Sequence, residues 1–141
     1  MEDEELREIL KRKAARIIAE SETCCRVKLG EGVYDIVEPS ELKEIVESCR
    51  AVFAFFYTPN CPYCRALKPV FEEVALYFRG RAAFVSANLA RFPFMSEALG
   101  ILGTPTIIVF VGGREAGRLA GLVPPERLEM IVRDVVEKVG C

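Results

Sequence analysis

The sequence contains no histidine and no tryptophan. Without an imidazole base, nucleophilic mechanisms of the Ser-His or Cys-His type are excluded, and so are metal sites with histidine ligands. Basic residues are not in excess either, because 19 Lys and Arg residues stand against 21 Asp and Glu residues, giving a net charge of −2. This balance gives no argument for nucleic acid or an anionic membrane as a partner.

Long hydrophobic runs are also missing. The apolar stretch 51–57 is among the longest and has seven residues, whereas a membrane helix needs about 20. Residues 1–20 begin with acidic side chains and lack the apolar centre of a secretory signal. We therefore expect a cytoplasmic protein with no membrane and no nucleic-acid partner.

Glutamine is absent and asparagine occurs only at Asn60 and Asn88, while arginine outnumbers lysine 13 to 6. A scarcity of thermolabile amides in a charged chain is typical of proteins from thermophiles, which is the source that we expect. With 141 residues, 51% of them hydrophobic, the chain has the size and composition of one packed domain.

The start of the chain differs from the rest. Hydrophobic periodicity predicts an amphipathic helix at 2–20, which either covers part of the core or docks a partner or a second copy. Residues 21–32 are expected to be a connection that can hold a short strand at 26–29. We therefore divide the chain into an N-terminal helical extension and connection, 1–32, and a main domain, 33–141.

Strands and helices alternate in the main domain. The run 51–57 is apolar throughout, which suits a central strand buried on both faces. Strands are predicted at 33–37, 51–57, 82–88, 106–111 and 115–120, and helices at 62–78, 93–99 and 124–139, with a further helix that Ser40 can cap. This order predicts an α/β fold with a central mixed sheet flanked by helices.

Cys61 and Cys64 lie where the buried strand 51–57 meets the helix 62–78. In the first turn of a helix their sulfur atoms can come together. The helix N-terminus favours an anion, so we expect the pKa of Cys61 to lie below the free value of about 8.5. The Cys61 thiolate would attack a substrate disulfide, and Cys64 would then attack the mixed disulfide and release the product.

Two other interpretations of this cysteine pair stay open. The pair could be half of a zinc site, but such a site needs two more ligands, and the other close pair, Cys24 and Cys25, is adjacent in the sequence. The two cysteines could also be inert and buried. Redox chemistry is favoured because a Cys-x-x-Cys pair within a strand-helix-strand pattern is typical of it.

Three segments resemble the thioredoxin-like superfamily, over about residues 33–139. The segment FFYTPNCPYCRALKPVFEEVA (55–75) contains the cysteine pair and has Pro69 where thioredoxins place the proline that kinks the active-site helix. The segment GTPT (103–106) resembles the family's cis-proline loop, and VFVGGREAGRLAG (109–121) resembles its C-terminal hairpin. The resemblance implies the thioredoxin fold, with an extra N-terminal helix.

The resemblance also implies roles for residues around the cysteine pair. Pro105 would be cis and would pack against the disulfide. Pro62, Tyr63, Thr104 and Pro105 would contact the substrate, with the Thr104 backbone pairing with an extended substrate segment. No cofactor and no metal are implied. The partners would be disulfide-containing proteins and an electron donor of the thioredoxin-reductase type.

Two positions depart from the family pattern. Thioredoxins carry a buried Asp six residues before the first cysteine and a Lys on the next strand, where this chain has Phe55 and Ser86. With no buried carboxylate close to Cys64, its deprotonation would rely on water. We therefore expect slower resolution than in a standard thioredoxin, and a faster turnover in the variant Phe55→Asp.

The dipeptide between the cysteines is a further departure. Pro-Tyr is the glutaredoxin form, whereas thioredoxins have Gly-Pro, and Tyr57 replaces the usual tryptophan. The acidic pair that holds glutathione in glutaredoxins is absent, because LAG (119–121) stands in its place. We interpret the chain as a thioredoxin framework with a glutaredoxin-type active site. Glutathione is a candidate partner that the sequence does not support.

Four cysteines lie outside the motif. Cys49 falls on the apolar face of its helix, so we expect a buried, inert thiol. Cys141 ends the sequence and could be a free thiol or form an intermolecular disulfide. Cys24 and Cys25 are either connection cysteines without a role, or part of a structural disulfide or an auxiliary thiol relay.

The function favoured by the sequence is that of a thiol-disulfide oxidoreductase that reduces protein disulfides. One alternative is an oxidase or isomerase of the same fold. The other is a non-catalytic binding module, in which the cysteine pair is incidental or holds a metal.

Overall fold

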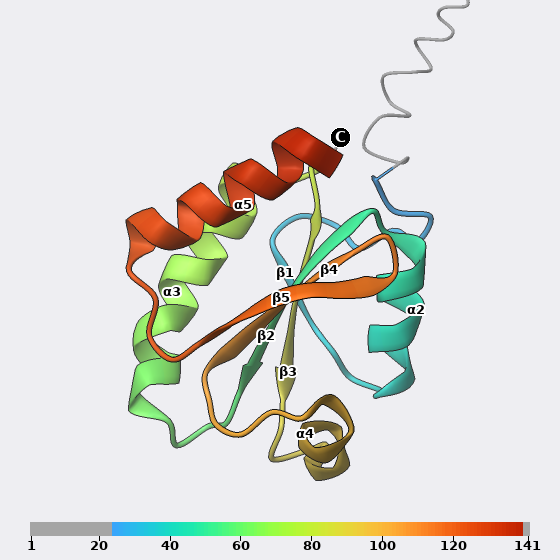
Figure 1. The fold of residues 1–141 in the computed structure, drawn as a ribbon. Helices are drawn as coiled ribbons and strands as arrows, with labels where there is room; N and C mark the ends of the chain where they lie inside the picture. Colours follow the sequence, from blue (N-terminus) through green and yellow to red (C-terminus); the bar gives the residue numbers. More distant parts are fainter. Residues whose placement is uncertain (1–23, 140–141) are drawn as a thin grey trace, which may run out of the picture.

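The computed structural model describes residues 24–139, and five strands of this part form one mixed sheet (Figure 1). The strands are β1 (Val33–Asp35), β2 (Ala51–Tyr57), β3 (Ala83–Asn88), β4 (Thr106–Val111) and β5 (Arg114–Ala120). Their order across the sheet is β1-β3-β2-β4-β5. Strands β1, β3 and β2 are parallel, whereas β4 and β5 each run antiparallel to their neighbours.

Strand β2 is the central strand, as predicted from its uninterrupted apolar sequence. Its first six residues are buried, because it pairs with β3 on one side and β4 on the other and is covered on both faces. Phe53, Phe55 and Phe56 are at most 2% exposed. The strand therefore anchors whatever follows Tyr57 at its C-terminal end.

Helices cover both faces of the sheet. They are α2 (Ser40–Ser48), α3 (Pro62–Tyr77), α4 (Pro93–Leu99) and α5 (Pro125–Val139). Apolar residues of α3 and α5 form one core cluster with one face of the sheet, and those of α2 and α4 form a second cluster with the other. Figure 1 shows these two layers, and they confirm the predicted mixed sheet flanked by helices.

The segment before β1 differs from the prediction. No strand forms at 26–29; the segment makes only an isolated antiparallel bridge between Cys25 and Cys49. The Arg26 N–H donates to the Ser48 carbonyl at 2.8 Å, and the Arg50 N–H donates to the Cys24 carbonyl at 2.8 Å. After this bridge, Val27 and Leu29 pack against the core cluster that includes α2 rather than pairing with a strand.

The start of α2 also differs from the prediction. Ser40 is the first helical residue rather than the cap, and no side chain of the preceding residue caps the helix. Instead, the Glu41 carboxylate accepts hydrogen bonds from the backbone N–H groups of Val37 and Glu38, at 2.8 and 3.0 Å. The Tyr34 hydroxyl donates to the same carboxylate at 2.6 Å.

The predicted helix at 2–20 lies outside the described residues, and the boundary at residue 32 stays a prediction. Between residues 24 and 139, every helix is too short or too polar to cross a bilayer.

Candidate active site

The cysteine pair lies at the C-terminal end of β2, where the chain turns into α3. Cys61 is the N-cap of α3 and Pro62 is its first residue. Cys61 and Cys64 form a disulfide, with their Cα atoms 5.1 Å apart. Cys61 is 9% exposed and Cys64 is 3% exposed, so the first cysteine is the more accessible of the two.

The backbone at the start of α3 is directed at the Cys61 sulfur. The Cys64 N–H donates to Cys61 Sγ at 3.1 Å. This N–H belongs to the first turn of the helix, whose donors have no partner within the helix. Such a donor stabilises negative charge on the sulfur, which is the requirement for an attacking thiolate.

The loop before β4 completes the site. The Thr104–Pro105 bond is cis, as the resemblance implied. The Thr104 carbonyl oxygen lies 3.5 Å from Cys61 Sγ, and the Thr104 and Thr58 hydroxyl oxygens lie 3.4 Å apart. The sheet produces this proximity, because Thr106 at the start of β4 pairs with Phe56 near the end of β2.

The surroundings of the disulfide include exposed side chains. Tyr63 of the dipeptide is 62% exposed, and Leu102 in the loop before β4 is fully exposed. Leu102 belongs to the same loop as Thr104 and lies two positions before it. The sequence analysis did not single out Leu102, because nothing in its neighbours distinguishes an exposed leucine from a buried one.

A polar cluster lies beside the middle of α3, at the small cavity lined by Lys68 and Glu72, and the sequence analysis missed its main member, Asp35. The Ser86 hydroxyl donates to Asp35 Oδ1 at 2.6 Å, and the Tyr57 hydroxyl donates to the same atom at 3.2 Å. Partial burial, followed by the negative charge of Asp35, raises the pKa of Tyr57 above its usual value. Tyr57 therefore stays a hydrogen-bond donor at neutral pH.

A second disulfide joins Cys25 and Cys49, so the expectation of an inert thiol at Cys49 is wrong. Of the alternatives for Cys25, the structure supports the disulfide. The reason is the backbone bridge between these two residues, which places their Cα atoms 3.9 Å apart. No local sequence pattern indicates that the connection returns to the end of α2.

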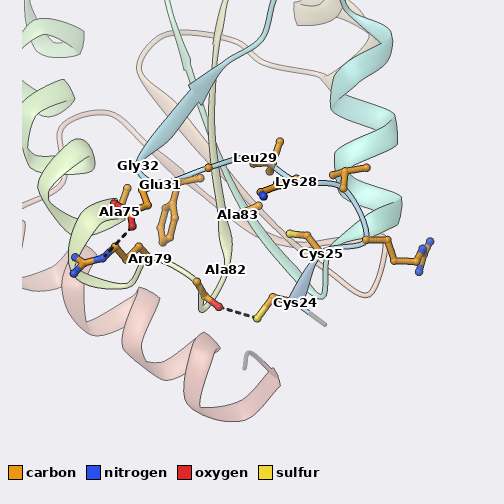
Figure 2. A pocket seen from close by; sticks show the side chains of 15 residues that line it. Cys24, Cys25, Lys28, Leu29, Glu31, Gly32, Ala75, Arg79, Ala82 and Ala83 are labelled. Atoms are coloured by element: carbon orange, nitrogen blue, oxygen red, sulfur yellow. Dashed lines mark hydrogen bonds and ion pairs between the residues drawn. The ribbon is translucent and has the colours of Figure 1, made fainter. Parts of the chain in front are cut away.

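A hollow of about 820 Å³ lies beside this second disulfide (Figure 2). It is lined by the segment 24–32 on one side and by the end of α3 and the start of β3 on the other. An ion pair between Arg79 and Glu31, at 3.8 Å, crosses it. Neither Cys61 nor Cys64 lines this hollow, so it is separate from the candidate active site.

Metal binding was the rival interpretation of the cysteine pair. Within residues 24–139, the acidic and cysteine side chains form no group of three or more that could hold a metal ion. In the structure, Cys61 and Cys64 are bonded to each other in a disulfide.

Comparisons with known proteins agree with this geometry. The family model described as thioredoxin matches residues 33–134. A thioredoxin of Alicyclobacillus acidocaldarius is 30% identical over 98 residues, which is 70% of this chain and 93% of the relative. The chloroplastic thioredoxin M4 of Arabidopsis thaliana is 33% identical over 89 residues, 63% of this chain but only 46% of that protein.

Solved structures add evidence on the fold. A thioredoxin mutant from Halobacterium salinarum superimposes with a TM-score of 0.69 at 23% identity, covering 77% of this chain and 94% of that one. The thioredoxin of Malassezia sympodialis gives a TM-score of 0.70 at 19% identity, with 78% and 96% covered. At these identities the structures establish the thioredoxin fold and nothing finer.

Proposed function

This chain belongs to the thioredoxin family of thiol-disulfide oxidoreductases, and we propose that its reaction is the reduction of disulfides in other proteins. The observation that carries this proposal is the hydrogen bond of 3.1 Å from the Cys64 N–H to Cys61 Sγ. It favours the thiolate at Cys61, the more exposed of the two cysteines.

The reaction has two steps. The Cys61 thiolate attacks one sulfur of the substrate disulfide, forms a mixed disulfide and releases the other substrate sulfur as a thiolate. Cys64 then loses its proton and attacks Cys61, which closes the disulfide of the protein and releases the second substrate thiol. A dithiol donor of the thioredoxin-reductase type returns the pair to the reduced form.

Substrate binding is proposed at the loop beside Cys61. The backbone of Thr104, next to Pro105, would pair with an extended substrate segment in the manner of an added strand. Pro62 and the exposed ring of Tyr63 would contact the same segment from the first turn of α3. Neither a prosthetic group nor glutathione has a role in this proposal.

The direction of the reaction is tested by the reduction potential of the Cys61–Cys64 pair. The full chain is equilibrated in dithiol buffers of known potential, alkylated and digested, and the peptide that carries both cysteines is quantified by mass spectrometry. This readout reports on Cys61–Cys64 alone, whatever the redox state of Cys25–Cys49. To act as a reductant in a reducing compartment, such as the cytoplasm that the sequence predicts, the Cys61–Cys64 pair needs a low reduction potential.

A value near about −270 mV supports the reductase, whereas a value near about −180 mV or above contradicts it and favours an isomerase or oxidase. The difference of about 90 mV corresponds to about 4 kcal/mol in the stability of the dithiol. A binding module would be indicated instead if Cys61→Ser retained the full biological activity of the chain.

A further inference from the structure

We propose that Cys24 forms a disulfide with Cys141, the last residue of the sequence, and that this bond closes the main domain into a covalent ring. Together with Cys25–Cys49 it would fasten both helical layers of the fold to two adjacent residues. The bond would lie at the end of the sheet opposite the candidate active site, and it is independent of the redox reaction proposed above.

The cysteine content of the chain leads to this pairing. The sequence has six cysteines, of which five lie within residues 24–139. Four of these five are bonded to one another in the two disulfides described above. Cys24 is a disulfide cysteine as well, so its partner is not among those four. The remaining cysteine of the sequence is Cys141, which lies outside the described residues.

The two adjacent cysteines face different helical layers. Cys25 packs against the core cluster of α2, which also contains Cys49. Cys24 faces the turn between α3 and β3 instead, where its Sγ lies 2.9 Å from the Gly80 carbonyl oxygen. Figure 2 shows the Cys24 side chain on the side of Ala82. We therefore expect the partner of Cys24 to come from the layer that contains α3 and α5.

Helix α5 runs toward this same turn. It begins near the candidate active site, because the Gly121 N–H donates to the Pro105 carbonyl at 2.9 Å and α5 starts four positions after Gly121. Further along α5, the Arg133 guanidinium lies 5.2 Å from the centre of the Phe78 ring, just after the end of α3. Figures 1 and 2 both show the end of α5 close to the segment that begins at Cys24.

The stretch of chain between α5 and Cys141 is short. Val136 belongs to the core cluster against which Ala82 packs, so the last turn of α5 lies beside the start of β3. The helix ends at Val139, and Cys141 follows two positions later. Two extended residues span at most about 7 Å, and a disulfide joins Cα atoms about 4.4–6.8 Å apart. Helix α5 thus ends next to the turn that Cys24 contacts.

The two bonds would tie opposite faces of the sheet to one point. Cys25–Cys49 joins the segment before β1 to α2, and Cys24–Cys141 would join the same segment to α5. The second ring would enclose all five strands, and a crosslink over on the order of 100 residues strongly restricts the unfolded chain. Cys24 is only 3% exposed, which protects its bond from the thiolates of other molecules, since exchange requires access to the sulfur.

Formation of the bond requires an oxidant, and a low-molecular-weight disulfide fulfils this role. One of the two protein thiolates attacks a sulfur of the oxidant, forms a mixed disulfide and releases one half of the oxidant as a thiolate. The second protein thiolate then attacks the protein sulfur of the mixed disulfide, and the other half leaves. Cys24 and Cys141 together lose two electrons and two protons, which the two released thiols take up.

Peptide mapping of the full chain tests the pairing. The chain is oxidised with glutathione disulfide, alkylated with N-ethylmaleimide and digested with trypsin without reduction. Because trypsin cleaves after Lys and Arg, Cys24 and Cys25 stay in one peptide, 17–26, whereas Cys49 lies in 44–50 and Cys141 in 139–141. We expect a species that joins all three peptides, and a monomer whose intact mass shows no alkylated cysteine.

Single variants assign the two bonds. Cys24→Ser should release peptide 139–141 in alkylated form and keep 17–26 joined to 44–50. The matched control Cys25→Ser should do the reverse, because it keeps 17–26 joined to 139–141 and leaves Cys49 alkylated. The two variants differ by one position in the sequence, so a general disturbance of this segment would affect both in the same way.

The crosslink should also be visible in unfolding without reductant. Cys24→Ser should lower the midpoint in guanidinium chloride by about 1 M, as expected for a ring of this size. Cys141→Ser and the double variant Cys24→Ser, Cys141→Ser should show the same shift, because each variant removes the same bond.

Alkylated Cys24 and Cys141 in the oxidised, unmodified chain would overturn the proposal, and so would a dimer linked through Cys141. Linkage of 139–141 to 17–26 in Cys24→Ser would also contradict it, as would shifts that add up in the double variant. The active-site cysteines lie in a separate tryptic peptide, 51–65. Failure of the pairing would therefore leave the proposed disulfide reduction, which is measured on that peptide, unaffected.

Discussion

Two disulfides within residues 24–139, Cys61–Cys64 and Cys25–Cys49, lie at opposite ends of helices, and the difference explains why the first is the one suited to redox chemistry. Cys61 is the N-cap of α3 and receives the Cys64 N–H. Cys49 is the C-cap of α2, where the unpaired groups of a helix are carbonyl oxygens. A thiolate is stabilised at the first position and disfavoured at the second.

Their surroundings differ in the same sense. Cys61 lies beside an open loop with the exposed Tyr63 and Leu102 nearby. The Cys25–Cys49 disulfide is enclosed by backbone hydrogen bonds on both sides of the bridge, from Arg26 to Ser48 and from Arg50 to Cys24. One cysteine pair can therefore meet a partner protein, while the other fastens the segment before β1 to the end of α2.

The largest effect that this comparison predicts is on activity. Cys61→Ser should reduce the rate of disulfide reduction by on the order of 1,000-fold or more, because the nucleophile is lost. The double variant Cys25→Ser, Cys49→Ser should keep at least half of the rate. Turnover of a disulfide-containing test protein with dithiothreitol as donor measures both, and an equal loss in the two variants would contradict the assignment.

The second effect is on stability, and here removal of Cys25–Cys49 should have the larger effect. Cys25 and Cys49 are 24 positions apart in the sequence, and a loop of this length predicts a loss of about 3 kcal/mol in the free energy of unfolding when the crosslink is removed. Opening Cys61–Cys64, which spans three positions, should cost less. Urea unfolding without reductant gives both values, and a larger loss from the Cys61–Cys64 pair would refute the distinction.

Much of the fold could be predicted from local sequence patterns. The apolar run of β2, the Gly112-Gly113 turn between β4 and β5 and the prolines at the starts of α3 and α5 each carry a signal within a few residues. Gly112 and Gly113 both have positive φ values, 62° and 86°, as the hairpin turn requires. The pair Cys61 and Cys64 is a local signal of the same kind, whereas the cis peptide bond at Pro105 was implied by the resemblance to the thioredoxin-like superfamily.

The features that were missed depend on contacts between distant segments. Asp35 is one acidic residue among 21 acidic residues, and only the pairing of β1 with β3 places it beside Ser86. The pairing of Cys25 with Cys49 likewise requires knowledge of where the connection runs. At Ser40 the local signal was outweighed, because Ser40 is already helical, and the Glu41 carboxylate instead binds the N–H groups of Val37 and Glu38, which precede the helix.

A third prediction concerns the ease of reducing each disulfide. If helix position controls thiolate stability, the reduction potential of Cys25–Cys49 should lie at least about 30 mV below that of Cys61–Cys64, which is about 1.4 kcal/mol. The two peptides can be followed in one experiment by alkylation and mass spectrometry across a series of dithiothreitol buffers. Reduction of both disulfides at the same potential would remove the proposed effect of the helix ends.

The smallest predicted effect concerns the Glu41 carboxylate, an anion in the first turn of α2. Hydrogen bonding from Tyr34, followed by the backbone N–H groups of Glu38 and Val37, lowers the pKa of Glu41 in the folded protein. A carboxyl group with a lowered folded pKa stabilises the protein above its unfolded pKa, and this contribution disappears as the pH falls through the folded pKa.

Glu41→Gln should therefore lower the free energy of unfolding at pH 7 by about 0.5 kcal/mol, a value kept small because the side chain is partly exposed to solvent. Between pH 7 and pH 3 the difference between the two proteins should shrink, because the Glu41 carboxyl group takes up a proton in the unmodified chain as the pH falls through its lowered folded pKa. Urea unfolding at both pH values measures it, with Glu44→Gln on the same helix as the control variant. A constant difference at both pH values would mean that shape rather than charge stabilises this helix end, and it would weaken the same electrostatic argument at Cys61.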